Sequence, residues 1–239
     1  MTDEDPGHPT TSRRAFLGSV GASAGAVALG AGADIASATQ ERPTTSRGAL
    51  LALLNGNKRY RQGRWTRRDY SPVGERRAIA QEPFAAILTC ADSRISPPLV
   101  FDVERGNVFC AHVAGNSLDT GTLGSIEYAV AVLKVRLVMV LGHTDCGAVK
   151  AALGVAAGTS SYPPETYGAI GAVVDAIVPA VRDIPAGPRQ LSQGITANAR
   201  AQARELRSRG PIIAPAADRG DIRVVAAVYD IATGAVKVV

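Results

Sequence analysis

The segment Leu137–Lys150 constrains the fold of this chain more than any other. It opens with five apolar residues, Gly142 breaks this run, and an alanine-rich segment that favours a helix follows. This pattern predicts a buried parallel strand, a tight turn and the start of a helix. His143 and Cys146 stand three residues apart at that turn, so their side chains can converge on one point.

A second segment has the same form. Residues 84–90 are another mostly apolar run, and Cys90 stands where that strand is expected to end. In open α/β sheets, binding sites form at the carboxyl ends of the strands. Two neighbouring strands can therefore deliver Cys90, His143 and Cys146 to one metal ion, and thiolate together with imidazole suits zinc. Three protein ligands leave the fourth position to water, which is the pattern of a catalytic zinc site.

The rest of the chain alternates predicted strands and helices, as α/β domains do. Strands are expected at 107–113 and 221–229, and a turn then leads into a hairpin strand at 235–239. The expected helices cover residues 44–64, 73–81, 121–133, 145–157, 170–181 and 192–209. Asn55, Gly56 and Asn57 weaken the middle of the first of these helices. Residues 39–239 contain neither an internal repeat nor a linker, so we expect them to form one domain.

Residues 1–38 are expected to be an export signal and not part of the fold. A twin-arginine pattern at 12–18 precedes a weakly apolar run at 19–33 that is too short to be a good membrane span. Small residues at 36–38 fit a cleavage site, and 31–33 are a second candidate. The mature protein is therefore expected outside the cytoplasmic membrane, in the periplasm, the cell envelope or the medium, without stable membrane insertion after cleavage.

Charge and cysteine content limit the possible partners. The chain of 239 residues has a formal net charge of +5 and three cysteines, which are too few for a disulfide framework. Six of its positive charges gather between Lys58 and Arg68. Such a cluster can bind nucleic acid or form the solvated face of a helix. We interpret it as a solvated face, so no nucleic-acid partner is expected.

Two separated motifs resemble the zinc signature of the β-class carbonic anhydrases: Cys90-x-Asp92-x-Arg94 and, 53 residues after Cys90, His143-x-x-Cys146-Gly147. The similarity runs from about residue 45 to the C-terminal hairpin. It implies an α/β fold with a four- to five-stranded, mainly parallel sheet flanked by helices, in a homodimer or a higher homo-oligomer. It also implies one zinc ion per subunit, bound by Cys90, His143 and Cys146. The implied reaction is the reversible hydration of carbon dioxide to bicarbonate and a proton.

Asp92 and Arg94 match the catalytic dyad of that family. Asp92 lies two residues from a zinc ligand, so an unrestrained carboxylate could bind the metal and close the site. A bidentate pair with Arg94 would hold the carboxylate away from the metal and orient it toward the attacking water. The alternative is a surface ion pair that contributes little.

Three further residues match positions at which the family binds its substrate, Gln81, Phe109 and Tyr128, and Gly147 is a fourth candidate for substrate binding. The resemblance implies that the Gln81 amide contacts bicarbonate and that Phe109 and Tyr128 line an apolar pocket. Gly147 stands at a helix start, where a backbone N–H can meet an anionic oxygen. As core aromatic residues, Phe109 and Tyr128 would need no such role.

Two alternative functions stay open at this point. One is the same fold and zinc site acting on carbonyl sulfide or carbon disulfide, because that motif is shared. The other is a non-catalytic zinc or redox-thiol binding protein. The Asp92–Arg94 pair argues against the second, since a structural zinc site needs a fourth protein ligand and no such dyad.

Overall fold

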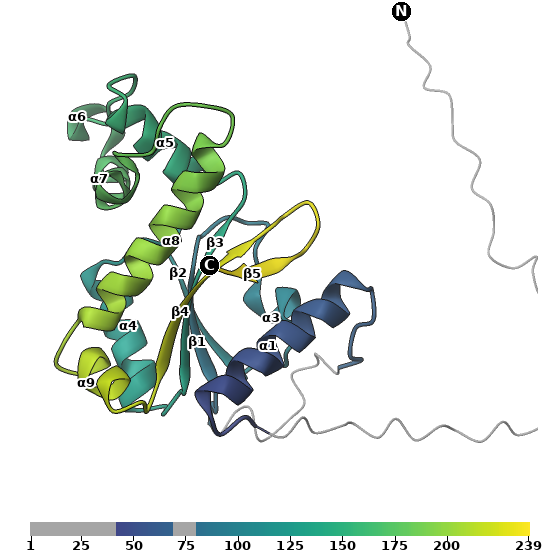
Figure 1. The fold of residues 1–239 in the computed structure, drawn as a ribbon. Helices are drawn as coiled ribbons and strands as arrows, with labels where there is room; N and C mark the ends of the chain where they lie inside the picture. The colour runs from purple at the N-terminus through teal and green to yellow at the C-terminus, as the bar shows by residue number, and fades with distance from the viewer. Residues whose placement is uncertain (1–41, 69–79) are drawn as a thin grey trace, which may run out of the picture. The chain divides into compact units, whose positions relative to one another are not determined.

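A computed structural model describes residues 42–68 and 80–239 of the chain (Figure 1). The predicted export signal lies outside the described residues, as do all but the last two residues of the helix predicted at 73–81. The elements, in chain order, are α1 (Ser46–Arg61), β1 (Ala85–Thr89), α3 (Pro97–Val100), β2 (Val108–His112), the 3-10 turn η1 (Ala114–Asn116), α4 (Thr120–Ala131), β3 (Leu137–His143), α5 (Gly147–Ala156), α6 (Pro164–Tyr167), α7 (Ile170–Val181), α8 (Gln190–Ser208), α9 (Ile213–Asp218), β4 (Arg223–Tyr229) and β5 (Val236–Val238).

The centre of the fold is a five-stranded sheet with the strand order β2-β1-β3-β4-β5. Strands β1 to β4 are parallel to their neighbours, and β5 returns antiparallel to β4. Every residue of β1 and β3 is buried, which is why both strands are almost continuously apolar in the sequence. The predicted fold class, a mainly parallel sheet of four or five strands flanked by helices, is confirmed.

Helices cover both faces of the sheet (Figure 1). Ala86 and Leu88 of β1 pack in one apolar cluster with residues of α4, α8 and α9. Their neighbours Ala85 and Ile87 point to the other face, where α1 and α3 lie. Helices α5, α6 and α7 lie beyond the carboxyl ends of the strands, beside the start of α8. Within residues 42–68 and 80–239, no helix is both long enough and apolar enough to cross a bilayer.

The predicted weakness in the middle of α1 is where this helix is attached to the domain. A Cβ atom at Gly56 would lie 1.7 Å from the backbone oxygen of Phe101, so only glycine allows this approach. The next residue, Asn57, is buried and donates hydrogen bonds to the backbone oxygens of Val100 (3.0 Å) and Gly234 (2.8 Å). Its Oδ1 accepts a hydrogen bond from the backbone N–H of Val236 at 3.0 Å.

Two of the clustered positive charges are structural, which corrects our interpretation of that cluster as a solvated face. The Asp102 side chain is fully buried and forms ion pairs with Arg59 and Arg68. Thr66 donates to the same carboxylate from its hydroxyl at 2.9 Å. This ion-pair network fastens the segment after α1 to the end of α3. Arg59 and Arg68 are therefore not part of a solvated face, because both bind the buried Asp102, which is distant from them in the sequence.

We expect Asp102→Asn to lower the free energy of unfolding at neutral pH by about 3 kcal/mol, the lower end of the cost of breaking a buried pair, because it leaves two partly buried arginine groups without their partner. Burial raises the pKa of Asp102, but hydrogen bonds from Arg68, Arg59 and Thr66 outweigh it and hold the pKa below its usual value. The stabilisation is therefore complete above the unfolded-state pKa of about 3.9 and is lost as pH falls through the lower folded-state pKa.

Urea unfolding of both proteins between neutral pH and about pH 3 measures this difference. Asp218→Asn is the matched control, because Asp218 forms an exposed pair with Arg207 and its loss should cost less than about 1 kcal/mol. A difference between wild type and Asp102→Asn that stays constant down to the lowest pH would contradict this account.

Candidate metal centre

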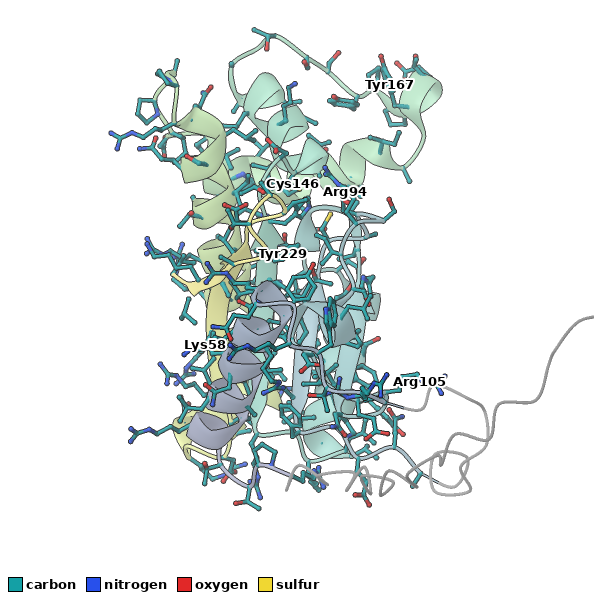
Figure 2. All side chains as sticks on the ribbon, turned by 90° about the vertical axis from the view of Figure 1, so that its right-hand side faces the viewer. Lys58, Arg94, Arg105, Cys146, Tyr167 and Tyr229 are labelled. Carbon is teal, nitrogen blue, oxygen red and sulfur yellow. The ribbon has the colours of Figure 1, made fainter. Side chains whose placement is uncertain are left out.

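The three predicted metal ligands meet at the carboxyl ends of two adjacent strands. Cys90 follows β1, His143 is the last residue of β3, and Cys146 directly precedes α5. All three residues are buried, and their ligand atoms lie within 4.8 Å of one another. A zinc ion held at about 2.0–2.3 Å by all three would draw these atoms somewhat closer together. Figure 2 shows Cys146 at this end of the sheet together with Arg94.

The imidazole of His143 is oriented by its own backbone neighbour. Its Nδ1 lies 2.8 Å from the backbone oxygen of Thr144, an acceptor, so Nδ1 carries the proton and donates it. In this tautomer Nε2 keeps its lone pair. Nε2 is buried and has no hydrogen-bond partner among the residues that the structure describes. A buried nitrogen of this kind needs a partner, and a metal ion beside the two sulfur atoms would supply one.

The two sulfur atoms lie close enough for each to shift the pKa of the other. A hydrogen bond from the Cys146 thiol lowers the pKa of Cys90, and contacts with His143 and the backbone of Gly115 lower it further against the effect of burial. The same hydrogen bond, together with burial, raises the pKa of Cys146. The Gly115 N–H donates directly to Cys90 Sγ at 3.2 Å. A zinc ion that binds both sulfur atoms as thiolates would displace the remaining proton from Cys146.

Asp92 and Arg94 form the predicted bidentate pair. Arg94 donates from Nε to Oδ1 at 2.8 Å and from NH2 to Oδ2 at 2.7 Å, and its backbone N–H adds a bond of 3.0 Å to Oδ1. These bonds from Arg94 hold the pKa of Asp92 below its usual range. The Asp92 oxygens are not part of the group of converging ligand atoms. The carboxylate is therefore ionised and restrained near the cluster.

Gly147 adjoins this cluster, as expected. It is the exposed first residue of α5, directly after Cys146. A Cβ atom at this position would meet no other atom within 4 Å, so the space beside it is open. An anion could approach the helix N-terminus at this position.

The other three predicted substrate residues do not reach the cluster of their own chain. Gln81 is exposed and precedes β1, whose five residues, at about 3.3 Å each, separate it from Cys90 by about 16 Å. Phe109 pairs in register with Ala86, near the amino end of β1. The Phe109 ring lies 6.4 Å from the ring of Tyr128 on α4, which is half-exposed. Within one chain, Phe109 and Tyr128 therefore lie together but away from the metal cluster.

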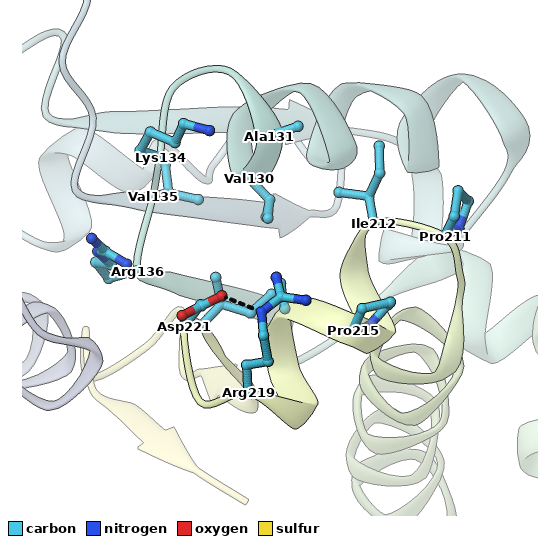
Figure 3. Close-up of a pocket in the computed structure, with 12 residues that line it drawn as sticks. Val130, Ala131, Lys134, Val135, Arg136, Pro211, Ile212, Pro215, Arg219 and Asp221 are labelled. Carbon is cyan, nitrogen blue, oxygen red and sulfur yellow. Dashed lines mark hydrogen bonds and ion pairs between the residues drawn. The ribbon is translucent and has the colours of Figure 1, made fainter.

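A groove of about 420 Å³ lies at the opposite end of the sheet (Figure 3). It runs between the end of α4 and α9, before the amino ends of β3 and β4. Lys134 and the ion pair of Arg219 with Asp221 border it. None of the predicted site residues lines this groove, so it is separate from the metal centre.

Thr144 and Gly115 contact two of the predicted metal ligands through their backbone groups, a role that the sequence alone did not indicate. Thr144 supplies the carbonyl that fixes the His143 tautomer, and its hydroxyl accepts from the Ile231 N–H at 3.0 Å. Gly115 contacts Cys90 through its backbone alone. Residue type carries no signal for a backbone contact.

Comparisons with known proteins agree with this site. Residues 85–236 match the family model described as carbonic anhydrase. The carbonic anhydrase of Mycolicibacterium smegmatis is 35% identical over 193 residues, which cover 79% of this chain and 91% of that protein. Carbonic anhydrase 2 of Mycobacterium tuberculosis is 48% identical over 107 residues, which cover 44% of this chain and 51% of that protein. That alignment thus spans about half of the relative's length.

A solved structure supports the same assignment. The Coccomyxa β-carbonic anhydrase, in complex with acetazolamide, is 30% identical to this chain with a TM-score of 0.60, and the match covers 69% of this chain and 75% of that one. The family model, these relatives and the convergence of two cysteines with one histidine at the strand ends all point the same way: the chain belongs to the β-class carbonic anhydrases.

Proposed function

We propose that this protein catalyses the reversible hydration of carbon dioxide: CO2 + H2O ⇌ HCO3⁻ + H⁺. The observation that carries the proposal is the cluster of Cys90, His143 and Cys146 with the restrained Asp92 beside it. One zinc ion per subunit, held by these three residues, would supply the Lewis acid that makes water nucleophilic near neutral pH.

Three residues of the chain have separate roles in this reaction. Asp92, ionised and held by Arg94, accepts a hydrogen bond from the attacking water and so points its lone pair at the carbon atom. Arg94 keeps this carboxylate from becoming a fourth metal ligand. The N–H of Gly147 at the start of α5 donates to the negative charge that develops on the bicarbonate oxygens.

Stopped-flow CO2 hydration by the zinc-loaded mature chain, at about pH 7.5 and again near pH 9, tests the proposal. We expect rapid turnover that is lost on metal chelation and regained with zinc. Zinc-loaded protein without CO2 hydration but with hydrolysis of carbonyl sulfide or carbon disulfide would establish the alternative substrates. Metal-free protein with freely titrating thiols would indicate the redox-thiol alternative.

We further propose that the working unit is a homodimer or a larger homo-oligomer in which a second copy completes the substrate pocket. Gln81, Phe109 and Tyr128 lie away from the metal cluster of their own chain, and Tyr128 leaves 46% of its surface exposed. A symmetric dimer can bring such a surface to the cluster of the other copy. Light scattering should therefore show no monomer at micromolar concentration.

Mixing two inactive variants tests this arrangement. Gln81→Ala removes the amide supplied to the other copy, whereas Asp92→Ala disables its own site. Each alone should be impaired, but a mixed dimer contains one intact site, so random reassociation should restore about one quarter of wild-type activity. Refolding the two variants separately and mixing them afterwards without exchange is the control. If no activity returns after reassociation, Gln81 acts within its own chain or not at all.

We also propose that the protein is exported by the twin-arginine route, on the pattern at 12–18. Replacing Arg13 and Arg14 by lysine should leave the protein in the cytoplasm of a bacterial host that has this pathway. Cell fractionation and immunoblotting measure the distribution. Equal export of both forms would refute the proposed route.

A further inference from the structure

Hydrogen bonds connect a pair of buried amides on α8 to the metal cluster. Asn198 is fully buried and Gln202 is 3% exposed, because both lie on the face of the helix that packs on the sheet. The other buried residues of this face are mostly apolar. Burying an amide costs free energy unless its hydrogen bonds are satisfied, and an apolar side chain could fill the same space. Their partners therefore show what these two amides hold in place.

Both amides bind the segment 114–118, which consists of η1 and the residues directly after it. Asn198 Nδ2 donates to the backbone oxygen of Gly115 at 2.8 Å. Gln202 Oε1 accepts from the backbone N–H of Leu118 at 2.9 Å, and its Nε2 donates to Asn198 Oδ1 at 3.2 Å. The amide of the turn itself, Asn116 Nδ2, is buried without a hydrogen-bond partner among residues 42–68 and 80–239. The turn is thus held from α8.

The turn in its place brings one backbone group to the cluster. Gly115 has a φ of 67°, a left-handed conformation, and its N–H reaches Cys90 Sγ at 3.2 Å. A Cβ atom here would lie 2.4 Å from Ile177 Cδ1 and 3.0 Å from Ala148 Cβ, so the backbone can approach only as glycine. The chain of bonds from α8 to the sulfur is Gln202 to Asn198, Asn198 to Gly115, and Gly115 to Cys90.

We propose that Asn198 and Gln202 are positioning residues for the metal centre: they fix the N–H of Gly115 on the Cys90 thiolate and thereby set how strongly this sulfur donates electrons to the metal. A hydrogen bond to a ligand thiolate both orients the sulfur and withdraws part of its charge. The inference rests on the proposed zinc centre but not on the reaction that the centre catalyses.

The first test is Asn198→Leu, which keeps the volume and removes the hydrogen bonds. We expect zinc to bind about 10–100-fold more weakly, measured by competition with a chromophoric chelator. The sulfur-to-cobalt charge-transfer band of the Co²⁺-loaded variant should move to longer wavelength, because the thiolate gains electron density. Gln202→Leu, which leaves the bond from Asn198 to Gly115 in place, should change both readouts in the same direction but less.

Gln193→Leu is the matched control, because Gln193 is an exposed amide on the same helix, and it should alter neither readout. A folded Asn198→Leu protein with the wild-type zinc affinity and cobalt band would overturn the inference. The two amides would then contribute only to the stability of the fold. A measurement on the wild type decides the matter if both variants fail to fold. In the ¹¹³Cd-loaded protein, the Gly115 amide proton should show scalar coupling to cadmium through the sulfur. Absence of this coupling would mean that Gly115 does not donate to Cys90, and it would overturn the inference.

These readouts separate the inference from the proposed function. Metal affinity, the cobalt band and the cadmium coupling are all recorded without turnover. A protein that shows the expected shifts but does not hydrate CO2 would uphold the inference and refute the proposed reaction. Rapid CO2 hydration by the wild type, together with a zinc affinity and a cobalt band that the variants leave unchanged, would support the proposed reaction and refute the inference.

Discussion

Asp92→Ala is expected to leave zinc bound while lowering the rate of CO2 hydration by at least about a hundredfold. The metal should stay because Cys90, His143 and Cys146 converge without the carboxylate. The rate should fall because no other acceptor is fixed in the same place: Arg94 holds this carboxylate through three hydrogen bonds. Metal content by elemental analysis and stopped-flow turnover on the same sample measure the two effects.

Asp218→Ala provides the matched control for this prediction. Asp218 also pairs with an arginine at 2.7 Å, but both side chains of that pair are exposed and lie away from the metal cluster. This variant should keep wild-type turnover and metal content. Near-normal turnover in zinc-loaded Asp92→Ala protein would exclude the proposed role of the carboxylate, whereas loss of zinc would show that Asp92 supports the metal instead.

Gly56→Ala is expected to destabilise the protein by about 3 kcal/mol, at the upper end of what overpacking costs. Helix propensity alone predicts the opposite, because alanine in the middle of α1 would be favoured over glycine by about 1 kcal/mol. The contact with Phe101 decides the sign: a Cβ atom would lie 1.7 Å from a backbone oxygen and 2.7 Å from a backbone carbon. Neither atom can rotate away, so the helix or α3 must shift.

Urea unfolding at neutral pH measures the change as a lower midpoint. Gly121→Ala is the control, because Gly121 is an exposed glycine in the first turn of α4 whose Cβ would make only an ordinary contact of 3.6 Å with Asp119. It should be neutral or slightly stabilising. A Gly56→Ala protein as stable as the wild type would mean that α1 does not pack on Phe101 in solution.

The sheet and the metal cluster could be predicted from the sequence for the same reason. Strands buried on both faces are almost continuously apolar, so a polar or reactive residue at their ends is conspicuous. Cys90 and His143 stand at two such ends, and parallel strands bring their ends to one edge. The predicted bounds of these strands differ from the observed ones by at most two residues.

Other parts of the molecule could not be predicted because tertiary contacts decide them. Helix α9 was missed, since it has six residues and Pro215 in its first turn reads as a helix breaker. The four-residue helix α6 is likewise absent from the predicted helices. Asn198 and Gln202 look like ordinary helix residues until η1 is seen against them. A motif match to Gln81 likewise does not say to which subunit's cluster this residue belongs.

The attachment of α1 has a consequence for the order of folding. Asn57 bonds to backbone groups 177 and 179 positions later in the chain, and Tyr60 meets the hydroxyl of Tyr229, 169 positions later, at 3.1 Å. Helix α1 is made early by the ribosome and can contact α3 soon afterwards, but it can complete its docking only after β4 and the turn to β5 exist. Contacts of such long sequence separation form slowly. The helix should therefore be the last element to gain protection from hydrogen exchange during refolding, and the metal-bearing strand ends should assemble before it closes over the sheet.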